Sequence, residues 1–259
     1  MAFATPTNSR ATFDAVLADA ARASMGRHIV SVGFELEGGM NNHEAFKLRR
    51  YVQDNGLDHY YSVKFEPQLQ VAGKQNSNME VQFHNEELQE LLGLLKFAYE
   101  NCGFATNSSC GFHIHVRFKD MAGAIRVFSS ERVIQDFMIR YAREFRDERY
   151  TRRLGSIYCS QDPTLYEPRE IGRAVYNKYS PINVGAYIEH QTIEFRIMPN
   201  QLSADEAKRS LLWLIRTAEE LYDAYHKNVP DPIMSKGYAR RALEAACRGD
   251  CPDIVEGRT

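Results

Sequence analysis

The sequence has few cysteines and no long apolar run. Its 259 residues include five cysteines, an odd number without the spacing of a disulfide framework, so we expect reduced thiols. Cys247 and Cys251 form a CxxxC pair with no second pair or neighbouring histidine to complete a zinc site. No apolar stretch approaches the ~20 residues that a membrane span needs. The sequence therefore predicts a soluble, cytoplasmic protein without a membrane partner.

Neither sign of charge is in large excess. Lysine and arginine number 32 and acidic residues 34, for a net charge of −2, so no general basic surface points to nucleic acid as a partner. The chain also lacks a GxxxxGK[ST] sequence, which excludes a P-loop enzyme. Its 44% hydrophobic and 25% charged residues are typical of a globular protein.

The spacing of apolar residues predicts strands and helices in mixed order. Strands are predicted at residues 28–37, 59–65, 79–84, 111–118, 179–188 and 191–198, the last two as an antiparallel hairpin. Helices are predicted at about 9–26, 42–54, 86–101, 129–150, 205–227 and 237–247, with Asn85, Ser130 and Ser203 as caps. No repeat or linker divides them. We therefore predict a single α+β domain over residues 1–259, with a core at about 28–227. Its mainly antiparallel sheet should have about six strands, with helices on the outer face.

Ionisable residues occupy strand positions where an ordinary core would be apolar. Three strands carry pairs with i, i+2 spacing, which puts both side chains on one face. The pairs are Glu35/Glu37, His113/His115 and Glu194/Arg196, and Glu80 lies on a further apolar strand. One such residue alone is explained equally well by a structural role, on a solvated strand face or in a local ion pair, and by a functional site. Their recurrence on one presumed sheet favours a shared site.

The residue types in this set favour a hard metal ion and a phosphate. Carboxylates with imidazole suit Mg²⁺ or Mn²⁺ better than structural zinc, which prefers thiolates or several imidazoles. Clustered carboxylates repel one another unless cations lie between them. Arg196, beside Glu194, has the planar fork that matches phosphate or carboxylate oxygens. Together they indicate phosphoryl transfer.

Several of these motifs, taken in order, resemble the amidoligase family. They are the ExE of the first strand, the later strand glutamate, "SSCGFHIHV", "KY…IN" and "TIEFR", within about residues 32–225. The family belongs to the ATP-dependent carboxylate–amine ligases of the glutamine synthetase and glutamate–cysteine ligase group. The resemblance implies a glutamine synthetase-like fold, in which a curved antiparallel sheet holds two or three Mg²⁺ ions (or Mn²⁺). The metal ligands would be Glu35, Glu37, Glu80, His113 and Glu194.

The resemblance also implies ATP as cofactor and small-molecule or peptide carboxylates and amines as substrates. Arg196 would contact the transferred phosphate beside Glu194, and Lys178 would bind a substrate or phosphate anion. His115 would lie behind a metal ligand or face the substrate. Glu66 stands where such families tend to have an aspartate, and is a further candidate.

An arginine series follows the histidine strand, with members near residues 140–153. Steps of three residues drift around a helix, so the series forms no straight stripe. The simpler interpretation is a solvated, salt-bridged helix. In the alternative, Arg146 or Arg149 reaches a substrate carboxylate.

The leading hypothesis is a carbon–nitrogen ligase that works through an acyl phosphate. The alternatives are a kinase of the same fold, acting on a guanidine or amine, and a catalytically inactive binding scaffold. The sequence does not indicate an oligomeric state.

Overall fold

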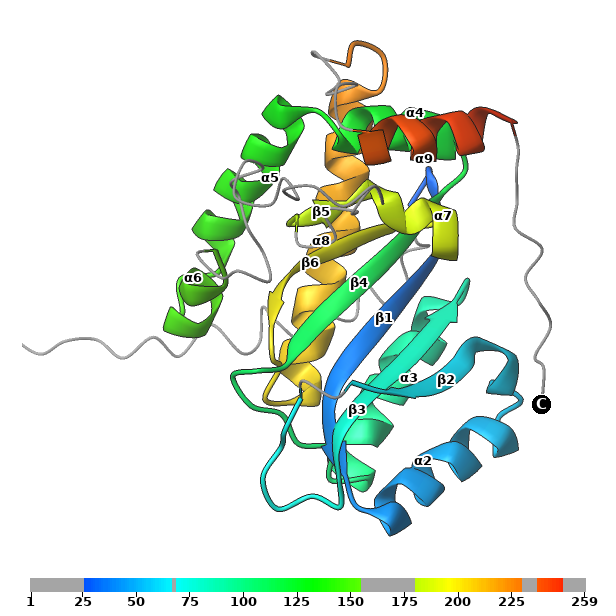
Figure 1. Cartoon of the computed structure of the whole chain (residues 1–259), viewed down its shortest axis with the longest axis vertical. Coiled ribbons are helices and arrows are strands. Elements are labelled where there is room, and N and C mark those ends of the chain that lie inside the picture. The colour runs from blue at the N-terminus through cyan, green and yellow to red at the C-terminus, as the bar shows by residue number, and fades with distance from the viewer. Residues whose placement is uncertain (1–25, 67–68, 155–179, 230–236, 249–259) are drawn as a thin grey trace, which may run out of the picture.

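The computed structural model describes residues 26–66, 69–154, 180–229 and 237–248. Six strands form one open sheet in the order β2-β3-β1-β4-β6-β5, and every neighbouring pair is antiparallel (Figure 1). The strands are β1 Ile29–Met40, β2 Tyr61–Phe65, β3 Asn76–Asn85, β4 Gly111–Phe118, β5 Ile182–Asn183 and β6 Ile193–Pro199. The predicted α+β domain with a six-stranded antiparallel sheet is confirmed.

Eight helices accompany the sheet in the described part of the chain. They are α2 Asn42–Asp54, α3 Leu88–Asn101, α4 Met121–Phe128, α5 Glu131–Glu144, α6 Glu148–Leu154, α7 Tyr187–His190, α8 Ala204–Tyr225 and α9 Gly237–Arg248. Short 3₁₀ turns lie at Asp58–Tyr60 and Val184–Ala186. Helices α3 and α8 lie behind the sheet in the view of Figure 1. None of the described helices is long and apolar enough to cross a membrane.

The two faces of the sheet differ in chemistry. Alternate residues of β1, β3 and β4 point toward the helices, and the rings of Phe34, Phe83 and Phe112 pack there with centroids about 6 Å apart. On β6, Phe195 packs edge-on against Phe128. All four of these strands carry polar side chains on the other face, because strand side chains alternate. The hydrophobic core therefore lies between the sheet and the helices.

The predicted hairpin at residues 179–198 is only partly correct. Strand β5 does pair antiparallel with β6, but it is two residues long. Gly185 and Ala186 follow it, and both are poor strand formers. The chain there forms a 3₁₀ turn and helix α7, and then returns through Gln191 in the left-handed conformation, with φ 55°.

The single helix predicted at 129–150 is divided in two. Helix α5 begins after Ser130 as predicted but ends at Glu144, and α6 begins at Glu148. Between them Phe145 is extended and buried, stacked on Tyr150 with ring centroids 4.5 Å apart. Burial of this ring competes with helix continuation, and the arginine series is therefore split between two helices.

Two predicted caps behave differently. Ser203 begins α8 and accepts the N–H of Glu206 at 3.2 Å, as predicted. Asn85 does not cap α3, because β3 continues to this residue and the helix begins only at Leu88. Asn85 instead accepts the N–H of Glu87 at 2.7 Å. The predicted helix at 9–26 lies almost entirely outside the described residues.

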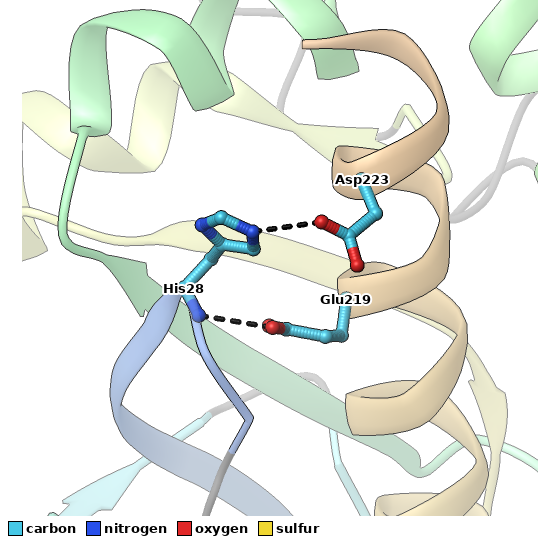
Figure 2. Close-up of side chains that lie close together, drawn as sticks. All are labelled: His28, Glu219 and Asp223. Atoms are coloured by element: carbon cyan, nitrogen blue, oxygen red, sulfur yellow. Dashed lines mark hydrogen bonds and ion pairs between the residues drawn. The ribbon is translucent and has the colours of Figure 1, made fainter.

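A clamp fastens the start of β1 to helix α8 (Figure 2). Glu219 Oε1 accepts the N–H groups of Arg27 (2.6 Å) and His28 (2.9 Å). His28 Nε2 lies 2.8 Å from Asp223 Oδ1. Gly26, at φ 104°, passes so close that a Cβ there would lie 2.6 Å from the Glu219 carboxyl carbon. His28, Glu219 and Asp223 are close enough to hold a metal ion, but these contacts give each a structural role.

Candidate active site

The antiparallel register aligns the predicted site residues on the sheet face opposite the core. Across β1 and its neighbours, Glu37 pairs with Glu80 and Glu35 with His113. Across β4 and β6, His115 pairs with Glu194. Directly opposite residues have Cβ atoms about 4.5–5.5 Å apart, so these side chains are within reach of one another.

One cavity of about 290 Å³ is lined by every predicted site residue that the structure describes. These residues are Glu35, Glu37, Glu66, Glu80, His113, His115, Glu194 and Arg196. Lys178 lies outside the described residues. The structure thus brings the predicted residues together, while their roles as ligands stay predictions.

His113 lies among three carboxylates. Its Nδ1 is 3.0 Å from Glu35 Oε2 and 3.5 Å from Glu194 Oε1. Its Nε2 is 3.9 Å from Glu37 Oε1. The ring is buried, so these carboxylates form most of its polar environment.

His115 belongs to an even more compact set. Its Nδ1 is 2.8 Å from Thr192 Oγ1, which fixes the ring. Its Nε2 is buried without a hydrogen bond, 3.3 Å from Glu35 Oε1. Single ligand atoms of Glu35, His115 and Glu194 all lie within 4.8 Å of one another. The sequence suggested a more distant role for His115, whereas its geometry suits direct coordination.

Glu194 and Arg196 form an ion pair where β6 departs from regular pairing. Arg196 Nη1 donates to Glu194 Oε1, and Asn183 Nδ2 donates to Glu194 Oε2 at 2.8 Å. The β4–β6 register shifts by one residue in the stretch that contains Arg196, and such bulges redirect side chains. Burial disfavours the charge of Arg196, but Glu194, Glu35 and Glu37 outweigh it and raise its pKa.

The carboxylates differ in how readily they ionise. Burial, together with the charges of Glu35 and Glu37, raises the pKa of Glu80 to about 8. Burial also disfavours ionisation of Glu35, but the charge of His115 and the hydrogen bond with His113 hold its pKa well below its usual value. Gln82 Nε2 bridges the two carboxylates, donating to Glu35 at 2.9 Å and Glu80 at 2.8 Å. Glu80 therefore keeps its proton at a pH where Glu35 has lost its own.

Arg153, the last member of the arginine series, is a site residue that the sequence interpretation did not favour. It is buried at the end of α6, where Nη2 lies 3.4 Å from His113 Nε2 and donates to the Arg196 carbonyl oxygen at 3.2 Å. The two arginines favoured in the alternative interpretation lie elsewhere. Arg149 pairs with Glu206, and Arg146 is exposed between α5 and α6 and donates to the backbone oxygen of Arg143.

Lys64 and Asn183 also line the cavity. Lys64 lies directly opposite Glu80 in the β2–β3 register and opposes the rise in the Glu80 pKa. The sequence contained signals for both residues. Lys64 alternates with Glu66 in "VKFEP", and Asn183 lies within the "IN" of the amidoligase-like motif.

No protein-family model matches the sequence, and neither does any curated protein.

Proposed function

We propose that the protein is an ATP-dependent carboxylate–amine ligase with a glutamine synthetase-like fold. One observation carries the proposal: acidic and basic side chains gather in one cavity on the face of an antiparallel sheet opposite the core, and among them are four carboxylates, two imidazoles and two arginines from the predicted set and its neighbours. They are Glu35, Glu37, Glu80, Glu194, His113, His115, Arg153 and Arg196. The resemblance to the amidoligase family rests on many of the same residues.

The residues present fit Mg²⁺ or Mn²⁺. Oxygen-rich sets of this kind bind hard cations, and a cation would relieve the repulsion from Glu35 and Glu37 that adds to burial in raising the pKa of Glu80. His115 Nε2, buried without a hydrogen bond, offers a nitrogen ligand beside Glu35 and Glu194. When bound, such ions neutralise phosphate charge and polarise reacting oxygens.

The proposed reaction has two steps. A carboxylate oxygen of the acid substrate attacks the terminal phosphorus of ATP, ADP leaves, and an acyl phosphate forms. The amine nitrogen then attacks the acyl carbon, the carbon–oxygen bond to phosphate breaks, and the amine loses a proton as phosphate leaves. Arg196 would hold two oxygens of the transferred phosphoryl group through its planar fork. Lys178 stays a predicted anion contact.

The scaffold alternative has a physical difficulty. Glu80, Glu194 and His113 are all buried, and burying ionisable groups costs free energy unless each is compensated. A surface used only for docking does not require that cost. The kinase alternative is consistent with the same phosphate-binding residues, so it is separated by experiment.

Hydroxylamine distinguishes a ligase from a kinase without knowledge of the natural amine. An acyl phosphate has an activated carbonyl that hydroxylamine attacks, and a phosphorylated amine or guanidine has none. With ATP, Mg²⁺ and a panel of glutamate, other amino acids and small dicarboxylates, we expect a hydroxamate and released phosphate. The ferric colour reaction measures the hydroxamate.

Variants connect the reaction to the site. Glu194→Gln should abolish hydroxamate formation, whereas Glu148→Gln, on the exposed surface of α6, should retain it. Circular dichroism should show that both variants are folded. A phosphorylated amine or guanidine, with no hydroxamate from any acid, would identify a kinase.

A further inference from the structure

A second cavity of about 530 Å³ adjoins the first along the polar face of the sheet. The two cavities share Glu35, His115, Glu189 and His190. From these residues the second cavity extends toward the start of β1 and the end of β4. A ligand in the second cavity can therefore reach the predicted metal ligands with one end.

The floor of this cavity contains a glycine. Gly33 lies opposite His84 on one side and His115 on the other. A Cβ at Gly33 would lie 2.9 Å from the Cβ of His84 and 3.0 Å from a backbone oxygen. Any larger residue would push the neighbouring strand or fill the cavity.

Arg117 provides a positive group at the far end. It lines the second cavity and is partly buried, and no ion pair or hydrogen bond of its side chain occurs among the described residues. It lies two residues beyond His115 on the same face of β4, about 7 Å along the strand. An arginine that lines a cavity and has no counter-charge among the described residues is well placed to bind an anionic group of a ligand.

The pKa of His84, another residue that lines the second cavity, reflects the positive charge of Arg117. The pKa of His84 is lowered by burial and by the positive charges of His115 and Arg117. The end that joins the first cavity carries two carboxylates, Glu35 and Glu189, beside the imidazoles of His115 and His190. The carboxylates that line the cavity therefore lie toward the reacting centre, and the guanidinium of Arg117 lies away from it.

We propose that this second cavity binds the amine substrate of the ligase, and that this substrate is an amino carboxylate. Its amine would face the Glu35–Glu189 end, and its carboxylate would contact Arg117. An acid substrate in this cavity would bring its reacting carboxylate beside that of Glu189, which is not among the predicted metal ligands, whereas an amine can donate to it. A nucleobase would bring no anion to Arg117. The inference rests on the proposed function, and it specifies an amino acid or short peptide as the acceptor.

Binding to matched ligand pairs tests the subsite without catalysis. Calorimetry would compare glycine, alanine, phenylalanine, glutamate and dialanine with the C-terminal amide of each. We expect at least one free carboxylate to bind at least tenfold more tightly than its amide. Arg117→Gln should reduce that ratio to about one, and Arg146→Gln, exposed between α5 and α6 and outside the lining of both cavities, should preserve it. No preference for any carboxylate in the wild-type protein would overturn the proposal.

Turnover separates this proposal from the ligase proposal. Hydroxylamine has no carboxylate, so Arg117→Gln should lower amino-acid-dependent ADP release at least tenfold more than hydroxamate formation. Equal losses with both nucleophiles would overturn the subsite and leave the ligase proposal standing. Carboxylate selectivity that depends on Arg117, with no hydroxamate from any acid, would support the subsite and contradict the ligase. Weaker ATP binding by Arg117→Gln, with the carboxylate-to-amide ratio unchanged, would assign the cavity to the nucleotide.

Discussion

Glu80 shows the electrostatic cost of gathering carboxylates on one sheet face. Its pKa is raised from 4.5 to about 8 by burial and by Glu35 and Glu37. The folded protein therefore binds one more proton than the unfolded chain between these two pH values. The free energy of unfolding falls as pH rises wherever the folded state holds more protons. The contribution of Glu80 to stability therefore decreases progressively as the pH rises from about 5 to 8.

Glu80→Gln should remove that contribution. With a metal chelator present, we expect the wild-type melting temperature to fall more steeply than that of the variant as the pH rises from 5 to 8. At pH 8 the variant should melt at a higher temperature, because an amide carries no charge to repel Glu35 and Glu37. Scanning calorimetry measures both. Glu148→Gln, exposed on α6, should follow the wild-type profile, and identical slopes for wild type and Glu80→Gln would contradict the assignment.

The shared face of the site residues was predictable, but their partners were not. Strand alternation alone puts His113 and His115 on one face, and likewise Glu35 and Glu37. The pairing of His115 with Glu194 depends on strand order and register, which connect residues far apart in the sequence. The compact position of His115 was therefore missed, although the residue itself was proposed.

At the scale of elements, the break between α5 and α6 decides which arginine reaches the site. The apolar periodicity of α5 continues through the break, so the sequence predicted one helix. The stacking of Phe145 on Tyr150 is tertiary, and it reorients the chain after Glu144. Arg152 and Arg153 look equivalent in sequence, yet only Arg153 is buried beside His113.

Arg153→Lys should therefore lower turnover. Lysine keeps the charge but loses the planar fork that contacts both His113 and the Arg196 carbonyl oxygen. We expect a loss of roughly 10²-fold in kcat/KM for ATP in the hydroxamate assay, on the scale of a removed transition-state donor. Arg152→Lys, an exposed partner of Glu148, is the matched control and should retain activity. A lower melting temperature with full activity would instead make Arg153 a structural tether for α6.

At the scale of the whole molecule, local patterns were sufficient for the sheet and insufficient for its connections. All six strands were predicted, because each is a short apolar or alternating run between turn residues. The β5–β6 connection was wrong, since a two-residue strand followed by Gly185 has too little pattern to distinguish from a longer strand. The polar face emerges only when β1, β3, β4 and β6 lie side by side in the observed order.

Because the predicted ligands come from four strands, cation and nucleotide binding should be coupled through the assembled sheet. Calorimetry of ATP with Mg²⁺ and with chelator should show at least a tenfold difference in affinity, about 1.4 kcal/mol. Mg²⁺ should also raise the melting temperature, since a ligand that binds only the folded state stabilises it. Glu35→Gln should lose both effects, because its carboxylate contacts both histidines of the site.

Asp223→Asn, in the clamp formed by His28, Glu219 and Asp223, is the control variant. It should lower the melting temperature by loosening β1 from α8 while retaining the Mg²⁺ dependence. Equal ATP affinity in Mg²⁺ and in chelator would contradict the metal-dependent ligase and favour the scaffold. Loss of the Mg²⁺ effect in Asp223→Asn but not in Glu35→Gln would move the cation to the clamp.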